Sequence, residues 1–151
     1  MPSIFIAHRG NVYGPNDREN TEDYIREALD EGFDVEVDVW FLNGEWFLGH
    51  DKPEHKTTLH FLQNNKLWCH AKHLPALSEI MTKYQDTIHT FSHNEDPVIL
   101  TSRGYLWVYP GCPIDKESIC VMPERVFYSW EELQTCKGVC SDYVYLYRNR
   151  F

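Results

Sequence analysis

Three carboxylates alternate with valines in one short segment, residues 34–39. The segment reads Asp-Val-Glu-Val-Asp-Val, and because successive side chains of a strand point to opposite faces, Asp34, Glu36 and Asp38 share one face. If that face is open to solvent, the strand is an antiparallel one with an acidic surface. If the face is covered, as in a parallel sheet, the carboxylates repel one another unless a proton or a cation lies between them. The segment therefore indicates either a solvated acidic face or a site for a divalent metal.

Polar side chains also end two other predicted strands. The first strand ends at His8, which Arg9 follows, and a later one ends with His70 and Lys72. In α/β sheets, ligands bind at the carboxyl ends of the strands, so these side chains are expected to converge on one site. Histidine titrates near neutrality and can act as a general acid or base, while preorganised positive groups stabilise negative charge that develops in a reaction.

A hairpin returns a second histidine toward the carboxylates. Asn43-Gly44 is a typical two-residue turn, and the strands that it joins bring His50 back to their level. In a regular register His50 would oppose Val37 and face away from the carboxylates. We therefore expect Gly49 to release the chain from pairing, which glycine permits, so that His50 enters the site.

The elements that must position these residues are short strands and a few helices. Helix signals predict a helix at 21–31 with Gly32 as its C-cap, a second that begins near Pro75, and a third that opens at the capping box of Ser129 and Glu132. One further helical turn is expected at 57–63. The predicted strands are 3–7, 34–42, 45–48, 67–71, 88–91, 97–100, 105–109, 119–122 and 139–142.

The length and composition favour one α/β domain that covers residues 1–151. Strands alternate with helices, no internal repeat or linker divides the chain, and 42% of the residues are hydrophobic. Eight βα units that close a barrel take about 250 residues, so the pattern by itself supports only the α/β class. The segments 91–96 and 105–110 are further candidates for the walls of a site. The aromatic residues of 105–109 are expected in the core, with Trp107 as an alternative floor of the pocket.

Charge and cysteine usage narrow the class of partner. The formal net charge is −9, which argues against nucleic acid and anionic membrane surfaces as partners. No apolar run approaches the roughly 20 residues of a membrane span, and the N-terminus lacks the features of a secretory signal. Five cysteines at irregular spacing describe neither a disulfide framework nor a zinc site. We expect a cytoplasmic protein with free thiols.

Four fragments in order along the chain resemble the signature of the glycerophosphodiester phosphodiesterase family. They are His8-Arg9-Gly10, Glu19-Asn20-Thr21, Glu36-x-Asp38 and Gly49-His50-Asp51. The resemblance covers residues 1–51 well and is only suggestive beyond them. It implies a TIM barrel that cleaves a small phosphodiester with one divalent metal ion, commonly magnesium or calcium. It also implies the site residues, which are His8 and His50 as the acid/base pair, Glu36 and Asp38 as metal ligands, and Arg9 and Lys72 as phosphate contacts.

The chain departs from the family pattern in two respects. The family has a third metal-binding carboxylate two residues before the strand-end lysine, and this chain has His70 there, which shifts the expected metal toward manganese or zinc. The chain is also short, so the implied barrel is a compact one with shortened or missing helices. Three functions remain open: a phosphodiester hydrolase, a lyase-type transfer that releases a cyclic phosphate, and a barrel that binds a phosphorylated ligand without turnover.

Overall fold

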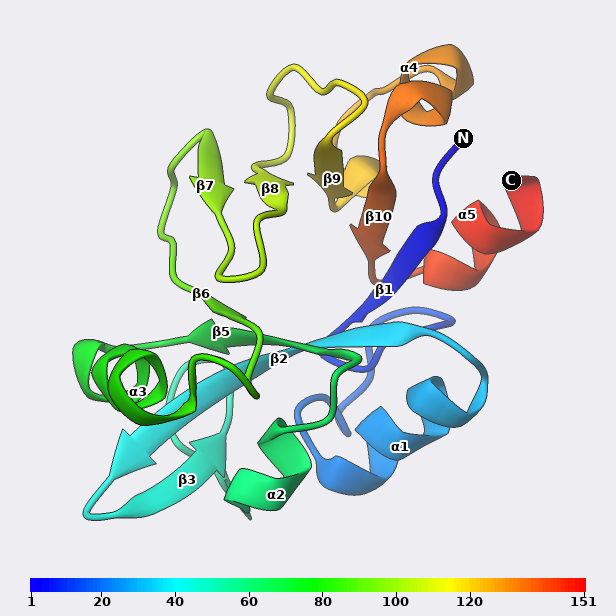
Figure 1. Cartoon of the computed structure of the whole chain (residues 1–151). Helices are drawn as coiled ribbons and strands as arrows, with labels where there is room; N and C mark the ends of the chain where they lie inside the picture. Colours follow the sequence, from blue (N-terminus) through cyan, green and yellow to red (C-terminus); the bar gives the residue numbers. More distant parts are fainter.

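A curled, mixed β-sheet organises the fold, and short helices pack around it (Figure 1). The computed structural model describes residues 1–151. The ten strands are β1 (Ile4–His8), β2 (Asp34–Leu42), β3 (Glu45–Leu48), β4 (His55–Thr57), β5 (Leu67–Ala71), β6 (Thr90–Phe91), β7 (Val98–Leu100), β8 (Leu106–Val108), β9 (Ser118–Val121) and β10 (Gly138–Ser141). The helices are α1 (Glu22–Asp30), α2 (Leu59–Leu62), α3 (Leu74–Glu79), α4 (Trp130–Thr135) and α5 (Val144–Arg150), with a π-helical turn at Ile80–Tyr84 and a 3₁₀ turn at Pro123–Arg125.

Seven of the strands are parallel neighbours, in the order β6-β5-β2-β1-β10-β9-β8. The other three strands pair in antiparallel fashion. β7 pairs with β8, β3 pairs with the second half of β2, and β4 pairs with β3. As a result β2 has three partners, with β1 and β3 along one edge and β5 along the other.

The predicted TIM-type barrel is wrong. The sheet is mixed and does not close, because β6 pairs only with β5 and no ladder joins it to β8. The physical reason lies in the connection between these two strands, which holds the strand β7 instead of a crossover helix. Hydrogen bonds connect β6 to the segment after β7: Ser102 N–H donates to the Thr90 carbonyl oxygen, Thr90 N–H donates to the Ser102 hydroxyl oxygen, and His89 Nε2 lies 2.8 Å from the Thr101 hydroxyl oxygen. The α/β class is confirmed, but with an open half-barrel and only five short α-helices.

Local predictions were more accurate than the global one. Each of the nine predicted strands and each predicted helix is present, with strand ends displaced by two residues at most. The sequence reading missed β4 and α5. The helix α5 begins Val-Tyr-Leu-Tyr, a run that favours a strand by intrinsic propensity, yet Val144 and Tyr147 are buried where the helix packs against β1 and β10. None of the helices has the length and apolar composition needed to cross a bilayer.

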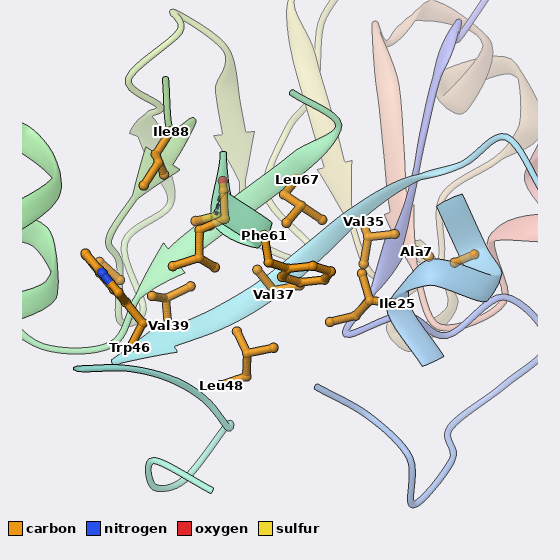
Figure 2. Close-up of a cluster of buried hydrophobic side chains, with 14 of the residues drawn as sticks. Ala7, Ile25, Val35, Val37, Val39, Trp46, Leu48, Phe61, Leu67 and Ile88 are labelled. Carbon is orange, nitrogen blue, oxygen red and sulfur yellow. Dashed lines mark hydrogen bonds between the residues drawn. The ribbon is translucent and has the colours of Figure 1, made fainter. Parts of the chain in front are cut away.

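The largest hydrophobic core lies on the outer face of β2 (Figure 2). Val35, Val37 and Val39 are fully buried and point into a cluster that contains Ile25 of α1 and Leu67 of β5. Since the side chains alternate, packing the valines into this core directs Glu36 and Asp38 to the opposite face, inside the curl of the sheet. The core therefore determines which way the carboxylates point.

The predicted hairpin turn is confirmed. Asn43 and Gly44 both have positive φ angles, 52° and 76°, as the favoured two-residue turn requires. Pairing ends where Val39 lies opposite Leu48. Gly49 then leaves the ladder with a φ angle of 158°, while its N–H donates to the carbonyl oxygen of Asp38.

A side chain at Gly49 should destabilise the protein. A Cβ atom there would lie 2.0 Å from the carbonyl oxygen of Lys52, so backbone would have to move. We expect Gly49→Ala to lower the free energy of unfolding by about 3 kcal/mol in urea denaturation. Gly44→Ala is the matched control, since that position has a positive φ angle but open space around it, and we expect a loss of about 1–2 kcal/mol. Equal losses for the two variants would contradict the steric explanation.

Candidate functional site

A cleft of about 220 Å³ opens where the parallel strands end. Residues at or just after the carboxyl ends of β1, β5, β6, β8 and β9 line it, together with the inner face of β2. Of the seven site residues predicted from the sequence, six line this cleft: His8, Arg9, Glu36, Asp38, His50 and His70. The seventh, Lys72, is not part of the cleft wall, and its Nζ lies 3.8 Å from Asp38 Oδ1.

The three residues predicted as metal ligands form one buried cluster. Potential ligand atoms of Glu36, Asp38 and His70 all lie within 4.8 Å of one another. His70 Nδ1 is 3.3 Å from Asp38 Oδ1, and their two strands pair at these residues. All three side chains are buried, so the acidic face of β2 is covered. Asp34 stands apart from the cluster and accepts a hydrogen bond from Trp68 Nε1.

The two carboxylates of the cluster differ in their affinity for protons. Burial raises the pKa of Glu36 to about 7, and the negative charge of Asp38 adds to the rise. Burial acts on Asp38 in the same direction, but the hydrogen bond and charge of His70, and the amide of Asn20, outweigh it and hold the pKa of Asp38 well below its usual range. The cluster thus concentrates negative charge in a place where water cannot solvate it.

Asn20 belongs to the site rather than to a helix cap. Thr21 is the N-cap of α1, and its side chain accepts the N–H of Tyr24. Asn20 Nδ2 donates to Asp38 Oδ2 at 2.9 Å, and its Oδ1 accepts the N–H of Asp38. The amide therefore bonds both the carboxylate and the backbone N–H of Asp38, and this fixes the position of the carboxylate.

His8 is held by a carboxylate that sequence reasoning missed. Its Nδ1 lies 2.7 Å from Asp142 Oδ1, and its Nε2 lies 3.8 Å from Glu36 Oε1. Burial lowers the pKa of His8, but the hydrogen bond to Asp142 and the charge of Glu36 outweigh it, so the pKa is raised above its ordinary value. Asp142 ends a predicted strand, 139–142, as His8 and His70 do. The same strand-end rule would have identified it.

Arg9 is bound on one side and lacks a partner on the other. Its Nη1 donates to Glu19 Oε1 at 3.2 Å. Its Nε is buried and makes no hydrogen bond, since Asp38 Oδ2 lies 3.5 Å away without hydrogen-bond geometry. A neighbouring amide, Asn11 Nδ2, donates to both Glu19 and Asp142 and so connects the supports of Arg9 and His8.

The second predicted histidine lies at the mouth of the cleft. The side chain of His50 is 45% exposed, against 13% for His8, and its Nδ1 lies 2.9 Å from Asp51 Oδ1. Burial of part of the ring lowers the pKa of His50, and the charge of Arg9 lowers it further. The two histidines therefore have pKa values shifted in opposite directions.

The remaining walls come from later parts of the chain. His93 stacks on His70 with ring centroids 4.5 Å apart, and Trp107 and Tyr109 also line the cleft, as the candidate segments 91–96 and 105–110 suggested. Arg125 was not anticipated. Its Nη2 lies 3.9 Å from Asp142 Oδ2, and it follows β9 in a 3₁₀ turn that carries no recognisable motif.

Comparisons with protein-family models, with curated proteins and with solved structures give no match. The chemistry of the cleft therefore has to be inferred from its own residues.

Proposed function

We propose that this chain is a metal-dependent phosphodiesterase that cleaves a small phosphodiester in the cleft. One observation carries the proposal: the buried cluster of Glu36, Asp38 and His70 adjoins a histidine, His8, whose other ring nitrogen is held by Asp142. Carboxylates and imidazole beside a fixed acid/base group are what metal-assisted phosphoryl transfer requires.

The cluster fits a divalent cation. It offers two carboxylates and one imidazole within 4.8 Å, in a buried setting where the carboxylates need a positive charge between them. The oxygen ligands suit magnesium or calcium, whereas the imidazole favours manganese or zinc. When bound, such an ion supplies Lewis acidity and neutralises the charge of a phosphoryl oxygen.

His8 is suited to transfer a proton. Because Nδ1–H donates to Asp142, the lone pair of the neutral ring lies on Nε2, and that is the atom nearest Glu36. Nε2 can therefore take a proton from the attacking group or return one to the leaving alkoxide. Asp142 holds the ring and stabilises its protonated form, as the raised pKa of His8 indicates.

His50 and Arg9 supply the complementary functions. His50 lines the same cleft from a more exposed position, so it can exchange protons with the second oxygen of the diester and with solvent. The guanidinium of Arg9 lines the cleft beside Asp38, so it can contact an anionic phosphate bound there. Lys72 adds positive charge beside Asp38.

Purified protein and a panel of glycerophosphodiesters test the proposal. We expect phosphorus NMR to detect a phosphomonoester whose formation stops with excess EDTA and resumes when Mn²⁺ or Mg²⁺ is added. A cyclic phosphate among the products would identify internal attack by a substrate hydroxyl in place of water. Tight binding of the diesters without any product, with every metal in the series, would contradict the enzymatic proposal.

A further inference from the structure

The chain makes a tight turn directly after β1, and this turn holds two residues of the cleft. Asn11 N–H donates to the carbonyl oxygen of His8 at 2.9 Å and closes the turn around Arg9 and Gly10. Both of these residues have positive φ angles, 57° and 93°, a conformation that a residue with a side chain, such as Arg9, rarely adopts. His8 and Arg9 line the cleft, whereas Asn11 is fully buried and does not.

The side chain of Asn11 uses both of its polar groups. Its Nδ2 donates to Glu19 Oε2 at 2.8 Å and to Asp142 Oδ1 at 2.9 Å. Its Oδ1 accepts a hydrogen bond from the hydroxyl of Tyr24, on α1, at 2.9 Å. Because a carboxylate can only accept, the NH₂ group has to face the two carboxylates, and the Tyr24 hydroxyl holds the amide in that orientation.

Each of the two carboxylates holds a different residue of the cleft. Glu19 Oε1 accepts Arg9 Nη1 at 3.2 Å, and Asp142 Oδ1 lies 2.7 Å from His8 Nδ1. The Asn11 amide lies between these carboxylates, which would otherwise repel each other. It therefore connects the group assigned to the phosphate with the group assigned to proton transfer.

We infer that Asn11, oriented by Tyr24, is a positioning residue that fixes the distance between Arg9 and His8, so that a phosphate bound by Arg9 lies within reach of His8 Nε2. This role rests on the proposed phosphodiesterase function. A displacement of about 1 Å far from the reacting atoms can lower a rate about 100-fold, so a residue that touches no substrate can still have a large effect.

Steady-state kinetics separates this role from a purely structural one. We expect Asp142→Asn to act mainly on kcat, through His8, and Glu19→Gln to act mainly on KM, through Arg9. Asn11→Leu keeps the approximate shape but loses every hydrogen bond, so it should show both effects, with kcat lowered about 10- to 100-fold and KM raised. Val12→Ala is the matched control, because Val12 is the next residue, is also buried and is apolar. It should lower the melting temperature and leave kcat and KM unchanged.

A double-mutant cycle tests the path through Asp142. If Asn11 acts on His8 by holding Asp142, its loss matters little once that support is gone. We therefore expect kcat of the variant with both Asn11→Leu and Asp142→Asn to lie within about threefold of kcat for Asp142→Asn alone. Losses that multiply in full would overturn this path.

Proton NMR in water gives a readout that needs no turnover. An imidazole N–H bonded to a carboxylate resonates far downfield, and the resonance that disappears in His8→Ala belongs to His8 Nδ1–H. We expect it to be sharp in the wild-type protein and in Val12→Ala. In Asn11→Leu it should broaden, because Asp142 is no longer held and the proton exchanges with water. An equally sharp resonance in Asn11→Leu would show that Asn11 does not hold the pair.

The two proposals fail in different ways. If diesters are cleaved and Asn11→Leu behaves like Val12→Ala, the positioning role is wrong and the phosphodiesterase proposal stands. If the wild-type protein cleaves no diester, the phosphodiesterase proposal is wrong, and the NMR result still decides whether Asn11 holds His8 through Asp142.

Tyr24→Phe keeps the inference testable if Asn11→Leu does not fold. This variant removes one hydroxyl and leaves the ring in place, so only the hydrogen bond to Asn11 Oδ1 is lost. We expect kcat to fall about fivefold, the equivalent of one hydrogen bond, and the His8 resonance to broaden. An unchanged kcat together with an unchanged resonance would overturn the inference.

Discussion

His8→Ala is expected to lower kcat for phosphodiester cleavage by about 10²- to 10⁴-fold, the usual range for removing a general acid or base. The size of the effect follows from the position of the ring. The side chain of His8 is 13% exposed, its Nδ1 is held by Asp142, and its Nε2 lies 3.8 Å from Glu36 Oε1. Alanine leaves no group there that can move a proton. His50→Ala should lower kcat by a factor in the same range. Phosphorus NMR, or a coupled assay of the released alcohol, gives kcat and KM for each variant.

The control for these variants is His60→Ala. His60 is an exposed residue of α2 outside the cleft, so its loss should leave kcat unchanged. Circular dichroism and urea denaturation should find all three variants folded. If turnover survives the combined loss of His8 and His50, the assignment of acid and base is wrong.

Glu36→Gln is expected to weaken binding of Mn²⁺ or Mg²⁺ by more than about 100-fold, since changes of even the groups that support metal ligands cost about 10- to 100-fold. The amide is nearly the same size as the carboxylate but carries no charge. In calorimetry the heat of binding should therefore disappear. Wild-type protein should gain about 2.7 kcal/mol of stability at a cation concentration of 100 Kd, and the variant should gain almost none.

Without metal, Glu36→Gln should not be less stable than the wild-type protein. Burial and the charge of Asp38 both disfavour ionised Glu36, so removing its charge should not lower the free energy of unfolding of the metal-free protein. Asp34→Asn is the matched control, because Asp34 lies on the same face of β2 but is bonded to Trp68 outside the cluster. The Asp34→Asn variant should bind the cation with the wild-type affinity. Unchanged cation binding in Glu36→Gln would remove Glu36 from the ligand set.

The candidate site was largely predictable because it depends on short-range rules. The alternation of residues 34–39 places the valines in a core and the carboxylates on the other face, whatever the sheet does elsewhere. The rule that polar residues end parallel strands brought His8 and His70 together, although their sequence positions are far apart. The hairpin turn carried His50 to the same cleft.

The global shape was not predictable in the same way. Whether a curled sheet closes depends on the pairing of its last two edges, and that pairing involves contacts distant in the sequence. Residues 97–100 were expected as a strand, but nothing in them indicated that they pair antiparallel with β8. The support of His8 by Asp142 was missed for a related reason: it needs β10 beside β1, a pairing between the two ends of the chain.

The strand β2, which carries Glu36 and Asp38, pairs with three other strands. It is paired with β1 and β3 on one edge and with β5 on the other, so we expect the backbone that carries Glu36 and Asp38 to be among the last parts of the sheet to open. Trp107 lies on β8, which pairs with β9 on one side and with the edge strand β7 on the other. The cleft is thus bounded by one strand paired along both edges and by another that lies next to the edge strand, so we expect local opening of the sheet to begin at β7 and β8 rather than at β2.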